Sequence, residues 1–219
     1  MNSTSIHNKI FITGGTGYIG SRLIPALIQN DFEIFALIRK GSENKLPVGC
    51  NIVFGDALNS SSYENNIPPC ETFIHLVGVA HPGPGKKEQF KSIDLVSIQQ
   101  AVPAALKAGV KYFIYLSVVQ PAPIMKDFIE VRMKGEELIR QSGLNATFIR
   151  PWYVLGPGHY WPYIFVPFYK LFEMIPSTRE SAKRLGLVKI DQMVNCITYS
   201  VKNPPNGIKI YNVNDILNF

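Results

Sequence analysis

Residues 9–20 have the sequence KIFITGGTGYIG, in which a short apolar run is followed at once by glycines at positions 14, 15, 17 and 20. Gly14 and Gly15 allow the chain to leave a strand through a tight turn, because glycine adopts backbone angles that other residues resist. Gly17 places no side chain between the backbone and a pyrophosphate, and Gly20 lets the following helix pack closely on the strand. The N-terminus of that helix offers N–H groups and a partial positive charge to phosphates. The stretch therefore predicts a nucleotide-binding loop.

Strands and helices are expected to alternate along the rest of the chain. The apolar segments that predict strands are 9–13, 33–38, 51–54, 72–77, 111–117, 146–150, 187–190 and 208–213. The segments that predict helices are 17–29, 88–108 with a kink at Pro103, 126–142, and a last helix to residue 201 with Asp191 as its N-cap. Nearly continuous apolar strands alternating with helices are typical of a parallel sheet covered on both faces. We therefore expect one α/β domain over residues 1–219 with a doubly wound parallel sheet, the Rossmann fold.

Composition favours a soluble intracellular protein. The chain has 219 residues, and its three cysteines are far apart with no CxxC pair. We therefore expect a reducing, cytoplasmic location, no disulfide framework and no metal site. The first residues lack the apolar core of a signal peptide. The net charge of +6 favours anionic ligands, but no basic cluster is interleaved with aromatic residues, so nucleic acid is not expected as a partner.

The end of the second predicted strand bears on which dinucleotide is bound. In Rossmann domains an acidic residue about twenty positions past the glycines binds the ribose 2′-hydroxyl of NAD, whereas this chain has Arg39 and Lys40 there. The planar guanidinium of Arg39 suits a phosphate, and Lys40 adds charge. We therefore predict NADP(H) as the cofactor, with NAD(H) as the less favoured alternative. The other interpretation is an exposed basic pair without a ligand.

The next two strand ends supply further candidates. Asp56 could accept a hydrogen bond from the adenine amino group, with Ala57 or Leu58 packed on the ring; alternatively, Asp56 is a turn residue or a helix N-cap. His75 falls within a strand and is expected to be a packed histidine rather than a catalytic one. His81 lies in a glycine–proline loop and is a weak candidate for any role.

Six motifs occur in a fixed order between residue 9 and about residue 160. They are Thr13–Gly20 (TGGTGYIG), Gly55–Leu58 (GDAL), His75–Gly78 (HLVG), Tyr115–Ser117 (YLS), Lys134–Glu136 (KGE) and Arg150–Pro151. On these motifs the chain resembles the extended-to-atypical branch of the short-chain dehydrogenases/reductases. The resemblance implies a cofactor site formed by Gly14, Thr16, Gly17, Tyr18, Ile19, Gly20, Arg39, Lys40, Asp56, Ala57, Leu76, Val77, Gly78, Lys134, Pro151 and Val154.

The same resemblance implies catalytic roles for two residues. Ser117 matches the serine that hydrogen-bonds a substrate carbonyl, and Lys134 matches the lysine that holds the nicotinamide ribose and lowers the pKa of a catalytic tyrosine. That tyrosine should stand four residues before the lysine, where this chain has Glu130. A glutamate, with an ordinary pKa of about 4.3, stays anionic beside an ammonium group and is a poor general acid. Glu130 and Lys134 are therefore expected to form a salt bridge on the helix surface.

Three functions remain open on this sequence. The first is an NADP(H)-dependent reductase of a small apolar carbonyl, enone or quinone, whose proton comes from elsewhere; Tyr153, His159 and Tyr160 are the candidates. The second is a non-catalytic NADP(H)-binding redox sensor or accessory protein, for which family members that lack the tyrosine set the precedent. The third, and the least favoured, is a nucleotide-sugar epimerase or dehydratase.

The segment after Pro151 departs from the alternating pattern. Residues 151–169 contain no Asp, Glu, Lys or Arg and hold eight aromatic residues, while prolines argue against one continuous membrane-spanning helix. We expect residues 151–186 to form a small aromatic-rich cap over the strand ends. Packing of the cap on the sheet is one interpretation. The other is an apolar pocket for a lipid-like or aromatic substrate, or a surface that contacts membrane lipid or a partner.

Overall fold

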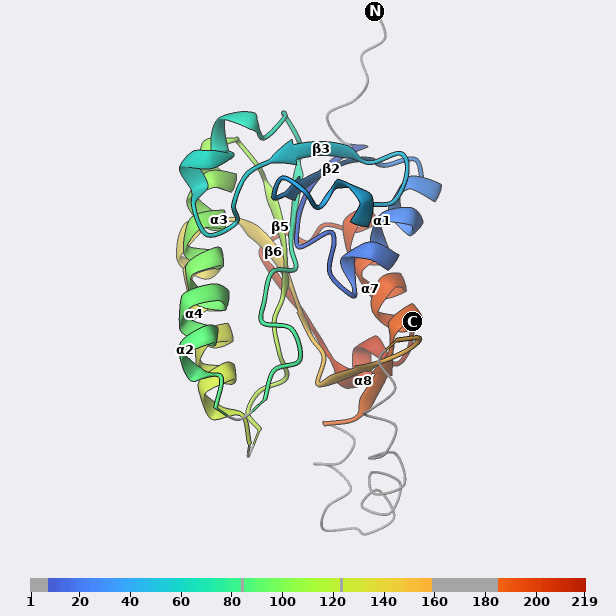
Figure 1. Ribbon diagram of the computed structural model, residues 1–219. Helices are drawn as coiled ribbons and strands as arrows, with labels where there is room; N and C mark the ends of the chain where they lie inside the picture. The colour runs from blue at the N-terminus through green and yellow to red at the C-terminus, as the bar shows by residue number, and fades with distance from the viewer. Residues whose placement is uncertain (1–7, 84, 123, 159–184) are drawn as a thin grey trace, which may run out of the picture.

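The computed structural model describes residues 8–83, 85–122, 124–158 and 185–219, and places a seven-stranded parallel sheet between two layers of helices (Figure 1). The strand order is β3-β2-β1-β4-β5-β6-β9. These strands are β1 Lys9–Thr13, β2 Glu33–Ile38, β3 Asn51–Phe54, β4 Thr72–His75, β5 Tyr112–Leu116, β6 Asn145–Arg150 and β9 Ile208–Asn212. The chain runs outward from β1 to β3 and then returns to β4 on the other side of β1, so the switch point of the sheet lies between β1 and β4. The predicted doubly wound fold is confirmed.

Helices cover both faces of the sheet. They are α1 Gly20–Gln29, α2 Lys87–Gln89, α3 Val96–Lys107, α4 Lys126–Ser142, α7 Ile190–Lys202 and α8 Val213–Ile216, with short turns η2 Glu43–Lys45, η3 Ser60–Ser62, η4 Glu64–Asn66 and the π-helical η5 Phe90–Leu95. Helices α1, α7 and α8 lie on one face, and α3 and α4 lie on the other (Figure 1). The first layer buries Leu23 and Ile197 against the sheet, and the second buries Ile98 and Ile139. Each face therefore has its own apolar core.

The predicted boundaries hold where apolar runs are sharply bounded. Helix α4 and strands β2 and β3 have the predicted limits. Helix α1 begins at Gly20 rather than at residue 17, because the preceding residues form a turn in which the Gly17 N–H donates to the Gly14 carbonyl at 3.0 Å. Strand β4 ends at His75 rather than at residue 77, and Leu76 and Gly78 beyond it line a cavity.

Two predicted helices differ in detail. The helix predicted at 88–108 is divided among α2, η5 and α3. The departure from α-helical geometry occurs in the π-helical η5 and not at Pro103, the predicted kink, which lies inside α3. Helix α7 begins at Ile190, and its N-cap is Lys189, whose N–H donates to the Gln192 side-chain oxygen at 2.9 Å. Asp191 is therefore a first-turn residue rather than the predicted cap.

Most of the predicted cap lies outside the described residues. His159, Tyr160 and the aromatic residues up to 169 belong to this part. Within 151–158 and 185–189, β7 (Tyr153–Leu155) pairs in parallel with β8 (Leu187–Lys189) in a separate two-stranded sheet. Among the helices of the described chain, none is long and apolar enough to cross a membrane.

Candidate functional site

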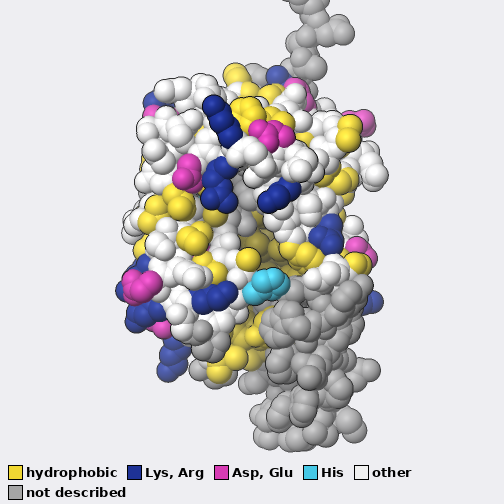
Figure 2. Space-filling model, in the orientation of Figure 1, with side chains coloured by type: hydrophobic (Ala, Val, Ile, Leu, Met, Phe, Trp, Pro, Cys, Tyr) yellow, Lys and Arg dark blue, Asp and Glu magenta, His cyan; other side chains and the backbone are white. Residues whose placement is uncertain are grey.

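Two cavities lie at the carboxyl ends of the central strands. One, of about 370 Å³, lies over the ends of β2 and β3 and is called here the β2 cavity. The other, of about 350 Å³, lies between the end of β5 and helix α4 and is called the β5 cavity. Both are lined by Gly14, Gly17, Leu76 and Gly78, so they meet over the glycine loop and form one groove across the switch point. Figure 2 shows this face hollowed between basic side chains and a histidine at the rim.

The groove brings together most of the residues predicted to bind a cofactor. Those that line the β2 cavity are Gly14, Thr16, Gly17, Arg39, Asp56, Ala57, Leu76, Val77 and Gly78. Those that line the β5 cavity are Gly14, Gly17, Tyr18, Ile19, Gly20, Leu76, Gly78, Pro151 and Val154, together with Ser117 and Tyr153. Lys40 and Lys134 line neither cavity.

The glycine loop has the geometry that a close approach of phosphate requires. Gly14 has φ +79°, and a Cβ on it would lie 2.8 Å from the Leu76 carbonyl carbon. A Cβ on Gly20 would lie 2.5 Å from the Gly14 oxygen, so glycine is needed there for the helix to start against the loop. A Cβ on Gly17 would meet only the Gly14 oxygen, at 3.2 Å, and would otherwise stand in open space. Gly15 differs from its predicted role in the turn: φ is not positive there, and the residue lies closely against Ile24.

The β2 cavity is basic at its outer end. Arg39 lines it as predicted, and Ser42 and Lys45, which sequence reasoning missed, line it too. They follow Arg39 through a turn at Gly41, where φ is +85°. The spacing of these residues carries no periodic signal, so only the folded turn shows that they share a cavity. Asp56 lines the cavity and also accepts the Leu58 N–H at 3.0 Å, so it is a turn residue as well.

The residues of helix α4 that line the β5 cavity differ from those predicted from the sequence. Lys134 and Glu130 lie on the exposed side and form the predicted salt bridge at 2.6 Å, in which Lys134 lowers the pKa of Glu130. The cavity is instead lined by Phe128 and Arg132, which have the same four-residue spacing. Two residues along an α-helix correspond to a rotation of about 200° around its axis. Glu130 and Lys134, two positions beyond Phe128 and Arg132, therefore face solvent instead of the cavity. The assignment of Lys134 to the nicotinamide ribose is therefore corrected.

Arg132 is the buried cation of the β5 cavity, with a side chain only 5% exposed. Its guanidinium donates to Asp94 Oδ1 at 2.6 Å, to the Leu116 carbonyl at 2.7 Å and to the Val77 carbonyl at 3.3 Å. A Cβ on Gly78 would lie 2.1 Å from Arg132 Nη2, so the guanidinium fills the space beside that glycine. Arg132 therefore ties the ends of β4 and β5 to η5 and α4.

Ser117 lines the β5 cavity, but its hydroxyl proton is already engaged. The side chain is buried and donates to Glu136 Oε1 at 2.6 Å. The Glu136 carboxylate also accepts from Arg150 Nε at 2.8 Å and from Gln120 Nε2 at 2.9 Å. Ser117 therefore directs its single hydroxyl proton to Glu136 and not to a substrate carbonyl, which is the role that the resemblance implied.

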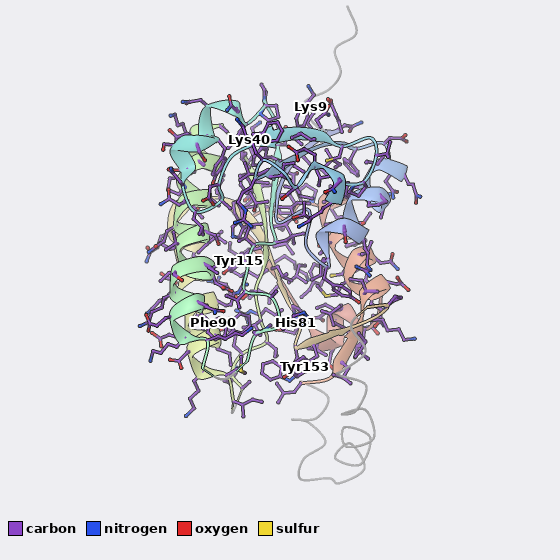
Figure 3. All side chains as sticks on the ribbon, in the orientation of Figure 1. Lys9, Lys40, His81, Phe90, Tyr115 and Tyr153 are labelled. Carbon is purple, nitrogen blue, oxygen red and sulfur yellow. The ribbon has the colours of Figure 1, made fainter. Side chains whose placement is uncertain are left out.

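The opposite wall of the β5 cavity carries aromatic and histidine side chains. Tyr153 and Trp152 come from the segment after β6, and His81 comes from the loop after β4. His81 and Tyr153 lie close together in the view of Figure 3, and both line the cavity. Burial raises the pKa of Tyr153, so its hydroxyl stays protonated.

His75 is confirmed as a packed residue. Its side chain is fully buried, with Nδ1 2.8 Å from Thr13 Oγ1 and Nε2 3.1 Å from Ser97 Oγ. Burial, and next the charge of Arg132, lower the pKa of His75 to about 3. It is therefore a neutral link between β1, β4 and α3.

Fold and groove together define a dinucleotide-binding Rossmann domain of the short-chain dehydrogenase/reductase type. A family model described as NAD(P)H-binding matches residues 14–159, and the chain belongs to that family. The Bordetella bronchiseptica enzyme WbmH, solved in complex with NAD⁺, shares the fold with a TM-score of 0.69 at 18% identity, over 94% of this chain and 75% of that one.

Two relatives have names that describe different reactions, a reduction and an epimerisation. A ceramide reductase of Caulobacter vibrioides is 25% identical over 158 residues, 71% of this chain and 49% of that protein. A UDP-glucose 4-epimerase of Vibrio cholerae is 22% identical over 239 aligned positions, 94% of this chain and 70% of that protein. The chain thus spans about half the length of the first relative and somewhat over two thirds of the second.

Proposed function

We propose that the protein is an NADP(H)-dependent reductase of a small apolar carbonyl, enone or quinone. The observation that carries the proposal is the continuous groove, with the glycine loop at its centre, basic residues at one end and an apolar cavity at the other. When bound, NADPH would supply the hydride for such a reduction. The relatedness to a protein named as a reductase supports the same class of reaction.

The preference for NADP(H) rests on the outer end of the β2 cavity. Arg39, Ser42 and Lys45 would hold the 2′-phosphate, since a guanidinium, an ammonium and a hydroxyl are all donors to phosphate oxygens. Asp56 and Ala57 would then face the adenine. An acidic residue in place of Arg39 would have favoured NAD(H) instead.

Titration of the protein with NADPH and NADH tests the cofactor assignment. Arg39→Ala should weaken NADPH about 10- to 100-fold, the loss expected for a charge-assisted hydrogen bond, and should leave NADH unchanged. Lys40→Ala is the matched control, because Lys40 lines neither cavity, and it should bind both cofactors like the wild type. Equal weakening of NADPH and NADH in Arg39→Ala would refute the assignment.

The substrate end is the β5 cavity, with Val118, Phe128 and Tyr153 among its walls. A volume of about 350 Å³ is at the small end of ligand pockets, which suits a nicotinamide ring with a small substrate. Consumption of NADPH should be measured with a panel of aromatic ketones, enones and quinones. The reductase proposal predicts turnover with at least one class.

A second candidate function is a non-catalytic NADP(H)-binding protein, such as a redox sensor or an accessory subunit. Phe128 favours it, because that residue has no proton to give, and so does the engagement of Ser117 by Glu136. A clear rise in melting temperature with NADPH, without turnover on any member of the panel, would support this candidate over the reductase.

The remaining alternatives have less support. The similarity to a UDP-glucose 4-epimerase supports the nucleotide-sugar epimerase alternative. Helix α4 does not support it, because its cavity-facing turn carries Phe128 instead of a tyrosine. A cytoplasmic location is proposed from the cysteines, because Cys50, Cys70 and Cys196 are all free. The proposed contact of the aromatic cap with lipid concerns residues that the structure leaves undescribed.

A further inference from the structure

The β5 cavity contains few groups that can give a proton to a reacting oxygen. Phe128 has no titratable hydrogen, and Arg132 stays protonated under all ordinary conditions. The proton of Ser117 is held by Glu136, and burial raises the pKa of Tyr153. Among the described residues that line the cavity, His81 carries an imidazole, the side chain that most often serves as a general acid.

The loop that carries His81 is fixed at its backbone. Lys86 Nζ donates to the Ala80 carbonyl at 3.1 Å and to the His81 carbonyl at 3.0 Å. His81 has φ +50°, in the left-handed region that non-glycine residues seldom occupy. Such backbone strain is concentrated at functional sites, where the surrounding structure maintains it.

The imidazole stands where a proton can be delivered and replaced. His81 lines the cavity together with Arg132 and Tyr153, yet it is an exposed residue, and Figure 2 shows a histidine at the rim of the hollow. Cavity and solvent are therefore both within reach of one side chain. This is the placement that a general acid needs if it is to be reprotonated after each turnover.

We propose that His81 is the general acid of the reduction and replaces the tyrosine that this chain lacks. As the substrate carbon gains the hydride, the electron pair of the C=O π bond moves to the oxygen. The N–H bond of the imidazolium breaks while the new O–H bond forms, and the neutral imidazole then regains a proton from water. The proposal rests on the reductase function proposed above.

The first test compares variants at positions 81 and 153. His81→Asn keeps a residue that tolerates the left-handed backbone but cannot transfer a proton. It should lower kcat at least 100-fold, within the range known for general acid catalysis, while the Kd for NADPH stays within about twofold. Tyr153→Phe, the variant of the competing donor, should lower kcat less than 10-fold. A loss in Tyr153→Phe with activity retained in His81→Asn would overturn the proposal.

Rescue separates a chemical role from a structural one. His81→Gly also suits the left-handed backbone and leaves space for a small base. Added imidazole should raise its kcat at least 10-fold and should not raise that of the wild type. Absence of rescue, with NADPH binding intact, would count against proton transfer by His81.

A binding readout tests the position of the imidazole without turnover. In the NADP⁺ complex, the imidazole NMR signal that disappears in His81→Asn should shift when a ketone reduced by the wild type is added. The His75 signal should stay unchanged. If the wild type binds NADPH but reduces no member of the panel, the reductase function and the role of His81 both fail; if it reduces a substrate and His81→Asn is fully active, only the role of His81 fails.

Discussion

Helix α4 presents two pairs of residues with the same four-residue spacing, one to the β5 cavity and one to solvent. Phe128 and Arg132 line the cavity, and Arg132 is tied to Asp94 and to two backbone carbonyls. Glu130 and Lys134 form an exposed salt bridge. The comparison shows that spacing defines which residues share a face, whereas only packing defines which face meets the site.

Replacement of the buried cation should have the largest effect on stability. Arg132→Met leaves the Asp94 carboxylate buried without its partner, and we expect a loss of about 3–5 kcal/mol in the free energy of unfolding. Denaturant unfolding measures it, with Lys134→Met on the solvent side as the control. An unfolding midpoint in Arg132→Met equal to that of Lys134→Met would contradict the assignment of the two faces.

Acid should destabilise the protein because His75 is fully buried and has a lowered pKa. Its pKa is about 3 in the folded protein and 6.5 at its ordinary value, so between these values the unfolded chain binds more protons. Stability is therefore lost as the pH falls below 6.5, by about 2 kcal/mol between pH 6.5 and 5. His75→Gln should show a shallower dependence in urea unfolding measured across this range. His81→Asn should keep the steep pH dependence of the free energy of unfolding. An equally steep dependence in His75→Gln would show that His75 is not a buried neutral histidine.

A methyl group on the buried side of α4 should cost less. A Cβ on Gly135 would clash with the hydroxyl oxygen of Tyr115, whose ring is fully buried. Overpacking should outweigh the gain in helix propensity, so Gly135→Ala is expected to lose about 1–2 kcal/mol. Thermal unfolding measures it, and a stabilised Gly135→Ala would show that the core yields.

The smallest effect should come from the solvent side. Glu130→Gln removes the partner of Lys134, but exposed ion pairs contribute little to stability. The melting temperature, the Kd for NADPH and any turnover should all equal those of the wild type. A large change in NADPH affinity would bring Glu130 and Lys134 back into the cofactor site.

Sequence reasoning recovered the sheet because the strands are bounded apolar runs, as at Glu33–Ile38. It predicted the limits of α4 correctly but assigned the wrong face of the helix to the site, although the sequence indicates which face is buried. Ile129, Arg132, Glu136 and Ile139 follow the 3-4-3 spacing of one helix face, and all four are buried. Charged residues are seldom fully buried, so Arg132 and Glu136 concealed the apolar face to which they belong.

The outer end of the groove was predictable only in part. Arg39 follows a strand, and its position past the glycines could be counted along the chain. Ser42 and Lys45 reach the same cavity through an irregular turn, where hydrophobic periodicity gives no guidance. His81 likewise depends on the path of a loop, so its place at the rim follows from the fold and not from its neighbours in sequence.

The space beside Gly78 links two positions that are far apart in the sequence. The guanidinium of Arg132 lies where a side chain at position 78 would begin. A chain with the same backbone and any larger residue at 78 must therefore carry a shorter residue at 132, and Asp94 would then need another cation or a neutral replacement. These three positions are expected to change together among relatives, and a shortened residue 132 should make Gly78→Ala tolerable where it is not in the present chain.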